Sequence, residues 1–571
     1  MKTTNFTKRV ALMALMLFIA VPSALAYSFE EGGIYYFQTR PGEVYVTYKD
    51  NNFNSYSGDV NIPSTFVHEG TTYTVKGIES YAFLYSAGLT SVTIPNTVLE
   101  IGNSAFSGCS GLTGITIPNS VTEIGNYAFD ECSGLKTVVI PNSVTTMGFS
   151  AFENCTSLTS VTLSNKLEII ESLAFYGCTS LKRITIPASV KTIDHQAFDQ
   201  CTSLESVTMS RGLISITNYA FRHCESLKQV IIPNTVTEIG SEAFAYCTNL
   251  KSATLSTSLE VIGQGAFRNC GLESIVIPNS VTYIDQLAFF YCQSLKEATI
   301  GDGVTEIGEY AFYMCTDMAS LKLGNHLEKI VHNAFKGCSA LTSLTIPNSV
   351  KTIENDAFGY CHALRSVIIG NGVTTIGSHA FHECENMTNL VLGNSLTSIE
   401  DYAFYSCSSL TTLNIPNSVE TINACAFAQC YGLKKVSIGS GVTSIGFGVF
   451  SAAWQLSSVT CHAVTPPTFT INEGWSYFNS NVYDQATLYV PEASISKYKQ
   501  AEVWKNFANI QAIRDHIPGD VNGDGEVNIA DVNAIIAAIL SGNNDTDFDV
   551  NGDGEVNIAD VNAIIDLILN Q

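Results

Sequence analysis

The chain has 571 residues, of which 46% are apolar and only 14% are charged, and it carries a net charge of -24 at pH 7. It is too long for one ordinary globular core of about 100–200 residues, unless it is built from repeats that pack only on their neighbours. The acidic balance excludes a basic surface for nucleic acid and disfavours binding to anionic membranes.

The N-terminus has the pattern of an export signal. Three basic residues precede an apolar run over residues 10–21, and small residues follow at Ala24 and Ala26. The run is too short to span about 30 Å of hydrocarbon, so the pattern predicts a signal peptide over residues 1–26. The alternative is an uncleaved anchor or a buried helix. Because no later apolar run approaches membrane-spanning length, we expect a secreted or surface-associated chain with no membrane insertion.

Residues 27–75 are aromatic and rich in β-branched residues, as in 34–37 and 44–48. This composition is typical of strands. Since these residues do not fit the repeat that follows, we expect a β-rich N-terminal cap that covers the first open sheet edge.

Alanine–phenylalanine pairs then recur with a fixed period. They run from Phe83 to Phe427 in steps of 23 residues, apart from one step of 22, and Phe450 follows in register. In one unit, residues 115–117 alternate as in a strand buried on one face, and Pro118-Asn119 has turn chemistry. Coils stacked at about 4.8 Å would place the phenylalanines above one another in a continuous buried spine.

The Ile-Pro, Ile-Gly and Ala-Phe-x-x-Cys elements of these units resemble the BspA-type leucine-rich repeats of bacterial surface proteins, over residues 76–452. The resemblance implies a curved or superhelical solenoid with a parallel sheet, used in adhesion and recognition. The fold class expected for the chain is therefore a mainly β repeat solenoid of about 16–17 coils with a cap at each end.

Most of the 17 cysteines lie three residues after a repeat phenylalanine. Export would normally suggest disulfides. However, the first unit has Ser86 at this position, and a site that accepts Ser or Cys needs a small side chain near backbone polar groups. We therefore favour reduced, buried thiols over disulfides, and a metal site is disfavoured because no Cys-x-x-Cys or Cys/His cluster occurs.

Residues 453–516 lose the repeat pattern and are expected to form an α/β C-terminal cap. Residues 487–491 have strand composition. Residues 494–513, with Tyr498, Trp504 and Phe507, are predicted to form a helix and a closing segment.

Two identical segments, 520–536 and 549–565, end the chain. Each has the spacing of an EF-hand-like calcium loop, with oxygen donors at positions 1, 3, 5, 7, 9 and 12 and glycine at position 6. Eleven acidic residues and no Lys or Arg occur from Asp520 onward, so a cation is needed to offset their repulsion. The predicted ligands of two calcium ions are Asp520, Asn522, Asp524, Glu526, Asn528, Asp531, Asp549, Asn551, Asp553, Glu555, Asn557 and Asp560.

Asp at position 12, the missing entering helix and the duplication resemble a type I dockerin, over residues 517–571. The resemblance implies a small α-helical module that binds a cohesin-type partner through loop positions 10 and 11. Here those positions are Ile529, Ala530, Ile558 and Ala559. Many dockerins carry hydroxyl residues there, so the alternative is a calcium-stabilised terminal module with no cohesin partner. After each loop an apolar stripe at helical spacing is expected to pack the two helices together.

No catalytic motif stands out. The ten histidines are scattered, and there is no nucleophile elbow, phosphate loop or dinucleotide fingerprint. His379, His382 and Glu383 lie close together, but we expect them in a solvated corner. The outward strand positions are mostly Ser and Thr, a long surface suited to weak binding at many points. An enzyme is disfavoured.

The sequence therefore predicts a binding or adhesion protein. The solenoid would recognise a host protein or glycan, and the dockerin would attach the chain, with calcium, to a cohesin-type partner. The alternative is a non-catalytic accessory subunit of an extracellular polysaccharide-degrading complex.

Overall fold

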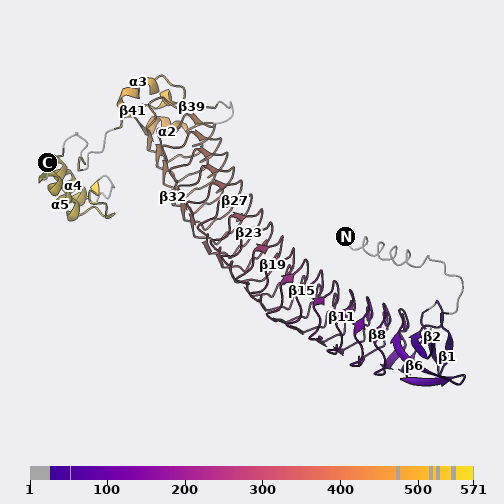
Figure 1. Ribbon diagram of the computed structural model, residues 1–571. Coiled ribbons are helices and arrows are strands. Elements are labelled where there is room, and N and C mark those ends of the chain that lie inside the picture. The colour runs from indigo at the N-terminus through magenta and orange to yellow at the C-terminus, as the bar shows by residue number, and fades with distance from the viewer. Residues whose placement is uncertain are drawn as a thin grey trace.

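A computed structural model describes residues 26–51, 53–470, 476–513, 519–521, 527–541 and 548–569. The repeat region is a long, curved solenoid in which each coil lies directly on the next (Figure 1). The fold class is the one expected, with about 19 coils rather than 16–17. The predicted signal peptide lies outside the described residues, except for Ala26. Among the described helices, none is long and apolar enough to cross a membrane.

Each coil contributes a short strand at its Ile-Gly element, and these strands pair in parallel with strict register, with one break between residues 147 and 169. For example, Thr192 pairs with Ser215, and Ile193 pairs with Ile216 in the next coil. The isoleucines point inward because one face of the sheet covers the core. The strands are β8 (Glu100–Ile101), β9 (Glu123–Ile124), β11 (Thr146–Met147), β13 (Ile169–Ile170), β15 (Thr192–Ile193), β17 (Ser215–Ile216), β19 (Glu238–Ile239), β21 (Val261–Ile262), β23 (Tyr283–Ile284), β25 (Glu306–Ile307), β27 (Lys329–Ile330), β29 (Thr352–Ile353), β31 (Thr375–Ile376), β33 (Ser398–Ile399), β35 (Thr421–Ile422), β37 (Ser444–Ile445) and β39 (Thr468–Phe469).

A second set of parallel strands precedes the Ile-Pro turns and is divided into shorter sheets. These strands are β7 (Leu89–Thr93), β10 (Thr137–Val139), β12 (Ser160–Thr162), β14 (Arg183–Ile186), β16 (Ser206–Met209), β18 (Gln229–Ile231), β20 (Ser252–Thr254), β22 (Ser274–Val276), β24 (Glu297–Thr299), β26 (Ser320–Lys322), β28 (Ser343–Ile346), β30 (Ser366–Ile369), β32 (Asn389–Val391), β34 (Thr412–Ile415), β36 (Lys435–Ile438) and β38 (Ser458–Cys461).

The unit used for the sequence prediction is an exception in this second set. Ile115 and Ile117 turn inward and Thr116 is exposed, as expected, but residues 113–118 form no strand. Gly114 occupies the place of Ser91 in the preceding coil, and glycine disfavours the extended conformation of a strand interior.

The third side of each coil is a turn around the repeat phenylalanine. Its backbone N–H groups bond the next coil: those of Tyr127, Phe129 and Glu131 donate to the carbonyl oxygens of Phe149, Ala151 and Glu153 at 2.8–3.0 Å. The residues two before and two after the phenylalanine have positive φ in almost every coil. Left-handed and right-handed backbone conformations therefore alternate along this turn. The alternation lets the turn form hydrogen bonds with the equivalent turn of the next coil, as strands do on the other sides.

The phenylalanines form the predicted spine. All seventeen are fully buried, and successive rings stack nearly parallel, as in the pair Phe358–Phe381 with centroids 5.3 Å apart and planes 8° apart. Tyr56 extends the stack before Phe83, and Phe478 extends it after Phe450. The shared core therefore continues into both caps.

The N-terminal cap is β-rich, as expected. Strands β1 (Phe29–Glu31), β2 (Ile34–Arg40) and β3 (Glu43–Thr47) form an antiparallel meander. The meander joins the first sheet because β3 pairs in parallel with β6 (Thr71–Ile78), which pairs with β8. The remaining strands are β4 (Gly58–Asn61), which pairs with β7, and β5 (Thr65–His68), which pairs with β6.

The C-terminal cap contains the predicted strand, β40 (Thr487–Val490), and short helices α2 (Ser480–Gln485) and α3 (Ile495–Tyr498). The helix and closing segment predicted over 494–513 form a shorter helix than the pattern suggested, followed by a strand. That segment contains α3 and the 3-10 turn η2 (Trp504–Asn506), then β41 (Asn509–Ala512), and another turn, η1 (Glu492–Ser494), precedes it. Val503 has φ +70°, which ends any helix there, and β41 pairs with β40 to close the sheet.

The C-terminal module contains two helices, α4 (Ile529–Ser541) and α5 (Ile558–Leu569). Their packing centres on four buried residues, Val532, Ile535, Val561 and Ile564, which occupy equivalent places in the two helices. The hydrophobic cluster is small, so the module has little apolar burial with which to fold by itself.

Candidate functional site

The second predicted calcium loop, residues 549–560, is fully described and is wound around Asp549. One carboxylate oxygen of Asp549 accepts hydrogen bonds from the N–H groups of Gly552 and Asp553, at 2.8 and 3.1 Å, and the other accepts from Gly554 at 2.8 Å. Gly552 and Gly554 have φ of +74° and +87°, a conformation that glycine adopts without strain. These turns wrap the backbone of the loop around the Asp549 carboxylate.

The loop ends at a capped helix. The N–H group of Asn557 donates to the carboxylate of Asp560 at 2.9 Å, and the Asn557 side chain accepts from Ala559 at 2.8 Å. The bond to Asp560 is one half of a capping box, and the Asn557 side chain caps a second N–H group of the first turn. Asp560 is fully buried. Burial acts to raise its pKa, but the N–H groups of Asn557 and Asn551 that bond its carboxylate outweigh this, so the pKa lies below its usual range.

These residues fit a hard cation. A buried carboxylate requires a compensating charge, and the chain has no Lys or Arg from Asp520 onward. Side-chain oxygens and one backbone carbonyl at these spacings are the donor set that Ca²⁺ prefers. Of the first loop, Asn522, Asp524 and Glu526 lie outside the described residues. Its C-terminal end repeats the geometry, with Asn528 donating to Asp531 at 2.9 Å.

The predicted partner-binding residues lie at the start of the two helices. Ile529 is 69% exposed and Ile558 is 67% exposed, while Ala530 is exposed and Ala559 is half-buried. The expectation that the whole apolar stripe packs between the helices is wrong in part. Four of its residues point outward instead, because they lie on the side of the helix opposite the core: Ile536, Leu540, Ile565 and Leu569. With Ile529 and Ile558 they form two equivalent exposed apolar stripes.

In the solenoid, the cysteine ladder links successive coils. The Sγ atom of Cys201 donates to the carbonyl oxygen of Phe175, in the preceding coil, at 3.2 Å, and fourteen other cysteines repeat this bond. All seventeen cysteines are free and buried. Burial raises the pKa of Cys109 to about 12 and that of Cys292 to about 12, so these thiols are poor nucleophiles.

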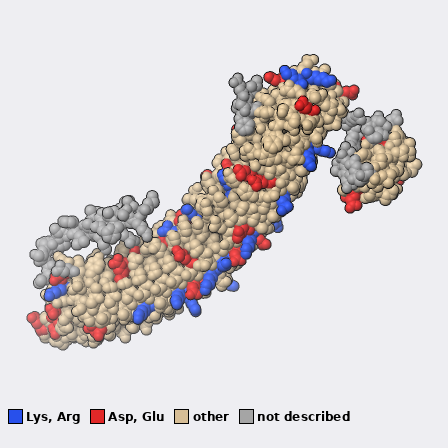
Figure 2. Space-filling model, turned by 180° about the vertical axis from the view of Figure 1, so that it is seen from behind, with Lys and Arg blue, Asp and Glu red and all other residues tan. Residues whose placement is uncertain are grey.

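The charged side chains are sparse on the solenoid, as its composition requires. Figure 2 shows large uncharged areas, with basic and acidic residues following one edge in a row. Three exposed ion pairs join neighbouring coils, with Lys228 bonding Glu205 at 3.1 Å, and with Lys251 and Lys296 both bonding Glu273. Exposed pairs of this kind contribute little to stability.

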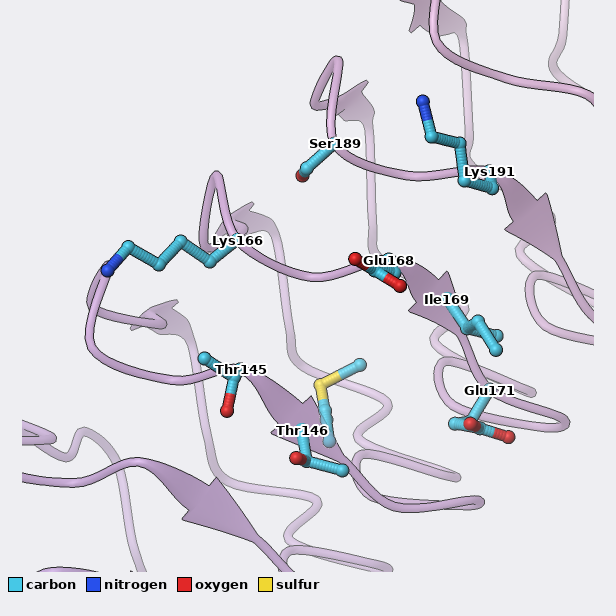
Figure 3. Close-up of a pocket in the computed structure, with 9 residues that line it drawn as sticks. Thr145, Thr146, Lys166, Glu168, Ile169, Glu171, Ser189 and Lys191 are labelled. Carbon is cyan, nitrogen blue, oxygen red and sulfur yellow. The ribbon is translucent and has the colours of Figure 1, made fainter.

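A groove of about 650 Å³ lies where β11 and β13 do not pair (Figure 3). It contains Glu168 and Glu171 from one coil, and burial together with the charge of Asp194 raises the pKa of Glu171. In Figure 3 the Lys166 side chain points away from Glu168. The Ser189 hydroxyl also lines the groove but has no hydrogen-bond partner, so no neighbouring base activates it, and we assign the groove no catalytic role.

The expected solvated corner at 379–383 is wrong for His382. This side chain is only 6% exposed, because its ring packs edge-on against Tyr360 with centroids 4.4 Å apart. Its Nδ1 lies 2.7 Å from the carbonyl oxygen of His379, and burial lowers its pKa. The corner is a packed turn that contains aromatic rings.

Sequence reasoning missed a cluster beside this corner. The ligand atoms of His362, Glu383 and Glu385 lie within 4.8 Å of one another. Glu385 follows His362 by one 23-residue period, so adding the repeat length to each histidine would have found the pair. Nδ1 of His362 lies 3.1 Å from the carbonyl oxygen of Glu383, which engages one ring nitrogen, and we assign the cluster no metal.

Together, these features define a leucine-rich-repeat solenoid that carries a duplicated EF-hand-like module. Residues 76–205, 168–296, 260–388 and 351–482 match the BspA type leucine rich repeat region, described as six copies. The chain belongs to this family. Residues 518–569 match the dockerin type I domain, a module that binds calcium and implies a cohesin partner. Both kinds of domain are typical of extracellular or cell-surface proteins.

Solved structures of similar proteins include a leucine-rich repeat protein from Bacteroides ovatus ATCC 8483, 26% identical, covering 78% of this chain and 100% of that one, with a TM-score of 0.47. A leucine-rich cell surface protein from Faecalibacterium prausnitzii A2-165 is 25% identical, covers 79% and 97%, and has a TM-score of 0.33. A comparison with curated proteins finds no match.

Proposed function

We propose that the chain is a secreted binding protein whose solenoid recognises a protein or glycan and whose dockerin attaches it to a cohesin-type partner. The observation that carries this proposal is the joining of two binding modules: a long rigid surface and a duplicated calcium module with two exposed apolar stripes. Repeat solenoids of this kind use extended surfaces for recognition.

Two calcium ions would hold the dockerin together. In the second loop, Asp549, Asn551, Asp553, Asn557 and Asp560 would supply side-chain oxygens and Glu555 would supply its carbonyl group. The first loop has the same residues, so it would bind the second ion with the same donor set. The ion neutralises the carboxylates, and the residues of the loop hold the helices in the orientation that exposes the apolar stripes.

The partner-binding surface would consist of Ile529, Ile536 and Leu540 on α4, or of Ile558, Ile565 and Leu569 on α5. Leu540 is 83% exposed and Leu569 is 76% exposed, and apolar side chains gathered on one face mark an interaction site. Since the two stripes are equivalent, either helix could dock on the partner. The partner would contact apolar side chains here, where many dockerins present hydroxyl groups.

The proposal is tested with the full chain and cohesin modules cloned from the same genome, by isothermal titration calorimetry with and without EDTA. We expect binding that requires calcium. Replacing Ile536, Leu540, Ile565 and Leu569 together by Ser should abolish binding. Replacing only the pair on one helix should leave the affinity within about a factor of two, because one of two equal sites remains. Binding that survives EDTA, or no binding to any cohesin, would reject the attachment role.

A further inference from the structure

The turns around the repeat phenylalanines carry a second, outer set of rings, which we name the aromatic ridge. It follows nine successive coils, from that of Phe221 to that of Phe404. Its members are Tyr219, Tyr246, Phe290, Tyr291, Tyr310, Tyr313, Tyr360, His379, Tyr402 and Tyr405. Each ring is partly exposed, and at about 4.8 Å per coil the ridge is about 40 Å long.

The rings hold one another in place from coil to coil. Phe290 stacks on Tyr313 with centroids 5.3 Å apart and planes 11° apart, and His379 stacks on Tyr402 at 4.9 Å. Tyr310 meets Tyr313 edge-on at 5.3 Å. The ridge is therefore ordered before any ligand arrives, which lowers the entropy lost on binding.

The two coils of the ridge without a ring supply a cation instead. The Arg268 guanidinium carbon lies 5.6 Å from the Tyr246 ring centroid and 5.2 Å from that of Phe290. The Lys336 Nζ atom lies 5.5 Å from the Tyr360 ring centroid. These contacts are within cation–π range, so Arg268 joins the rings on either side of its coil, and Lys336 extends the ridge from Tyr360 into the coil of Phe335.

The backbone does not require these bulky side chains. Tyr246, Tyr291 and Tyr360 sit two residues after the repeat phenylalanine with φ of 57–63°, a conformation unfavourable for all but Gly, Asn and Asp. Gly177 and Gly337 occupy the same position in other coils, with φ of +69° and +78°. Non-glycine residues adopt this conformation along the whole solenoid, as at Glu131 and Gln200, so the fold accepts aromatic residues at these positions without needing them for packing.

We infer that the aromatic ridge binds an extended polysaccharide chain, with sugar units lying along the exposed ring edges and sugar hydroxyls bonded by phenol, imidazole and carboxylate groups. The ridge places at least one ring or cation in each of nine successive coils, so a ligand of identical units can make many contacts along it, each weak and together strong. A folded protein has no such repeat. Acidic residues beside the cations, Glu242 near Arg268 and Asp356 near Lys336, disfavour nucleic acid.

This inference rests on the proposed binding role of the solenoid and names its ligand class and its surface. It also separates the ridge from the Ser/Thr strand face on which the sequence placed weak, extended binding. Outward residues on that face, such as Ser160, Thr162 and Thr345, are short and exposed and provide no ring.

The test uses affinity electrophoresis of the full chain in gels that contain xylan, mixed-linkage β-glucan, galactomannan, pectin or starch. We compare wild type with a ridge variant, Tyr291→Gly, Tyr310→Gly, Tyr360→Gly and Tyr402→Gly. The matched control is Tyr81→Gly with Tyr85→Gly, which changes the same left-handed positions outside the ridge. We expect at least one polysaccharide to retard wild type and control equally, and at least tenfold weaker binding for the ridge variant.

Because glycine suits these positions, the ridge variant should fold, which its circular dichroism and Tm would verify. If it does not, Tyr310→Gly and Tyr360→Gly made singly should each weaken binding in part. Retardation unchanged in the folded ridge variant would overturn the inference but leave the solenoid as a binding module at another face. The inference would also be overturned if no polysaccharide retards the wild type, or if the ridge variant loses binding to a protein ligand instead. The calcium-dependent binding of a cohesin is tested separately and does not depend on this result.

Discussion

A single thiol in each coil connects that coil to the one before it. The Phe175 carbonyl oxygen accepts both the N–H group of Cys178 in its own coil and the S–H group of Cys201 in the next. Serine could donate in the same way, as its presence at position 86 indicates, but the thiol also packs as a small apolar group in a core that excludes water. The ladder is thus part of the packing and needs no disulfide.

The ladder should make the solenoid sensitive to alkaline pH. Burial raises the pKa of Cys361 and of Cys430 to about 12, above the usual value of about 8.5 for an unfolded chain. A thiol whose pKa is raised on folding binds its proton more tightly in the folded state, so its contribution is complete below the unfolded pKa and is lost as pH rises above it. Each cysteine then costs about 1.4 kcal/mol per pH unit.

We therefore expect the Tm of the reduced chain to be nearly constant from pH 6 to 8 and to fall increasingly steeply above about pH 8.5. The measurement is thermal unfolding followed by circular dichroism across this range. Burial also raises the pKa of Cys155, Cys178, Cys201 and Cys224, so replacing these four by Ser should make the alkaline fall shallower. An equal fall in the two proteins would show that other groups control it.

The redox state of the ladder can be counted directly. In denaturant without reductant we expect Ellman's reagent to detect more than ten of the 17 thiols, because the fifteen ladder S–H groups are bonded to carbonyl oxygens and are shielded from oxidants in the folded chain. In the native protein the same reagent should detect few, since every cysteine is buried. Two or fewer thiols in denaturant would mean that the ladder is oxidised.

The spine should depend strongly on each ring. Phe244 is fully buried and stacks on Phe221 and on Phe267, with centroids 5.3 and 5.4 Å away. Replacing it by Ala removes a large buried side chain in the middle of a regular stack and should cost about 3–5 kcal/mol. Urea unfolding of the variant measures this, with exposed Phe149→Ala (38% exposed) as the control, for which we expect a change below about 1 kcal/mol.

At the level of elements, the repeat period alone predicted the parallel sheets and the spine, because equivalent side chains recur at each coil and can only be buried together. It did not predict the left-handed turns around residues such as Tyr291, since those positions accept Tyr, Gly, Gln and His alike and so carry no compositional pattern. The ridge went unnoticed for the same reason. Its rings are recognisable only when neighbouring coils are superposed.

The structure of the C-terminal cap was harder to predict than that of the repeats. Residues 494–513 have helical composition, but their Tyr498 and Trp504 are drawn into the core, where the Trp504 indole N–H donates to the carbonyl oxygen of Pro467 at 2.9 Å. Tertiary contacts of this kind override local propensity. In the dockerin, the spacing of oxygen-bearing residues was enough to predict two calcium loops. It could not predict which residues of each apolar stripe face inward, because that depends on how the two helices pack.

The dockerin should unfold without calcium while the solenoid does not. Its apolar core is small and its loops are strongly acidic, so the ion contributes folding free energy directly. We expect EDTA to expose residues 519–569 to limited proteolysis and leave the solenoid intact. Asp560→Ala should have the same effect in the presence of calcium, and Asp566→Ala, on the exposed side of α5, should not. Equal protection of the module with and without EDTA would contradict the calcium assignment.

At the level of the whole molecule, stability in a solenoid is approximately a sum over coils and the interfaces between them. Coils should therefore be removable one at a time if the register is kept. Deleting residues 124–146 removes one 23-residue period and joins Glu123 to Met147, which recreates a strand of the first sheet and keeps the Phe106 and Phe152 rings adjacent. We expect this variant to keep the circular dichroism spectrum of the parent, with a Tm within a few degrees.

A deletion of half a period should have the opposite effect. Removing residues 124–135 takes out Phe129 and Cys132 and leaves a segment too short to complete a coil, so the ring stack, the thiol ladder and the first sheet are interrupted at one place. Because each coil contacts only its neighbours, the damage should divide the solenoid into two blocks that unfold separately. A single cooperative transition at the parent temperature in this variant, or failure of the full-period deletion to fold, would show that the coils do not stack as interchangeable units.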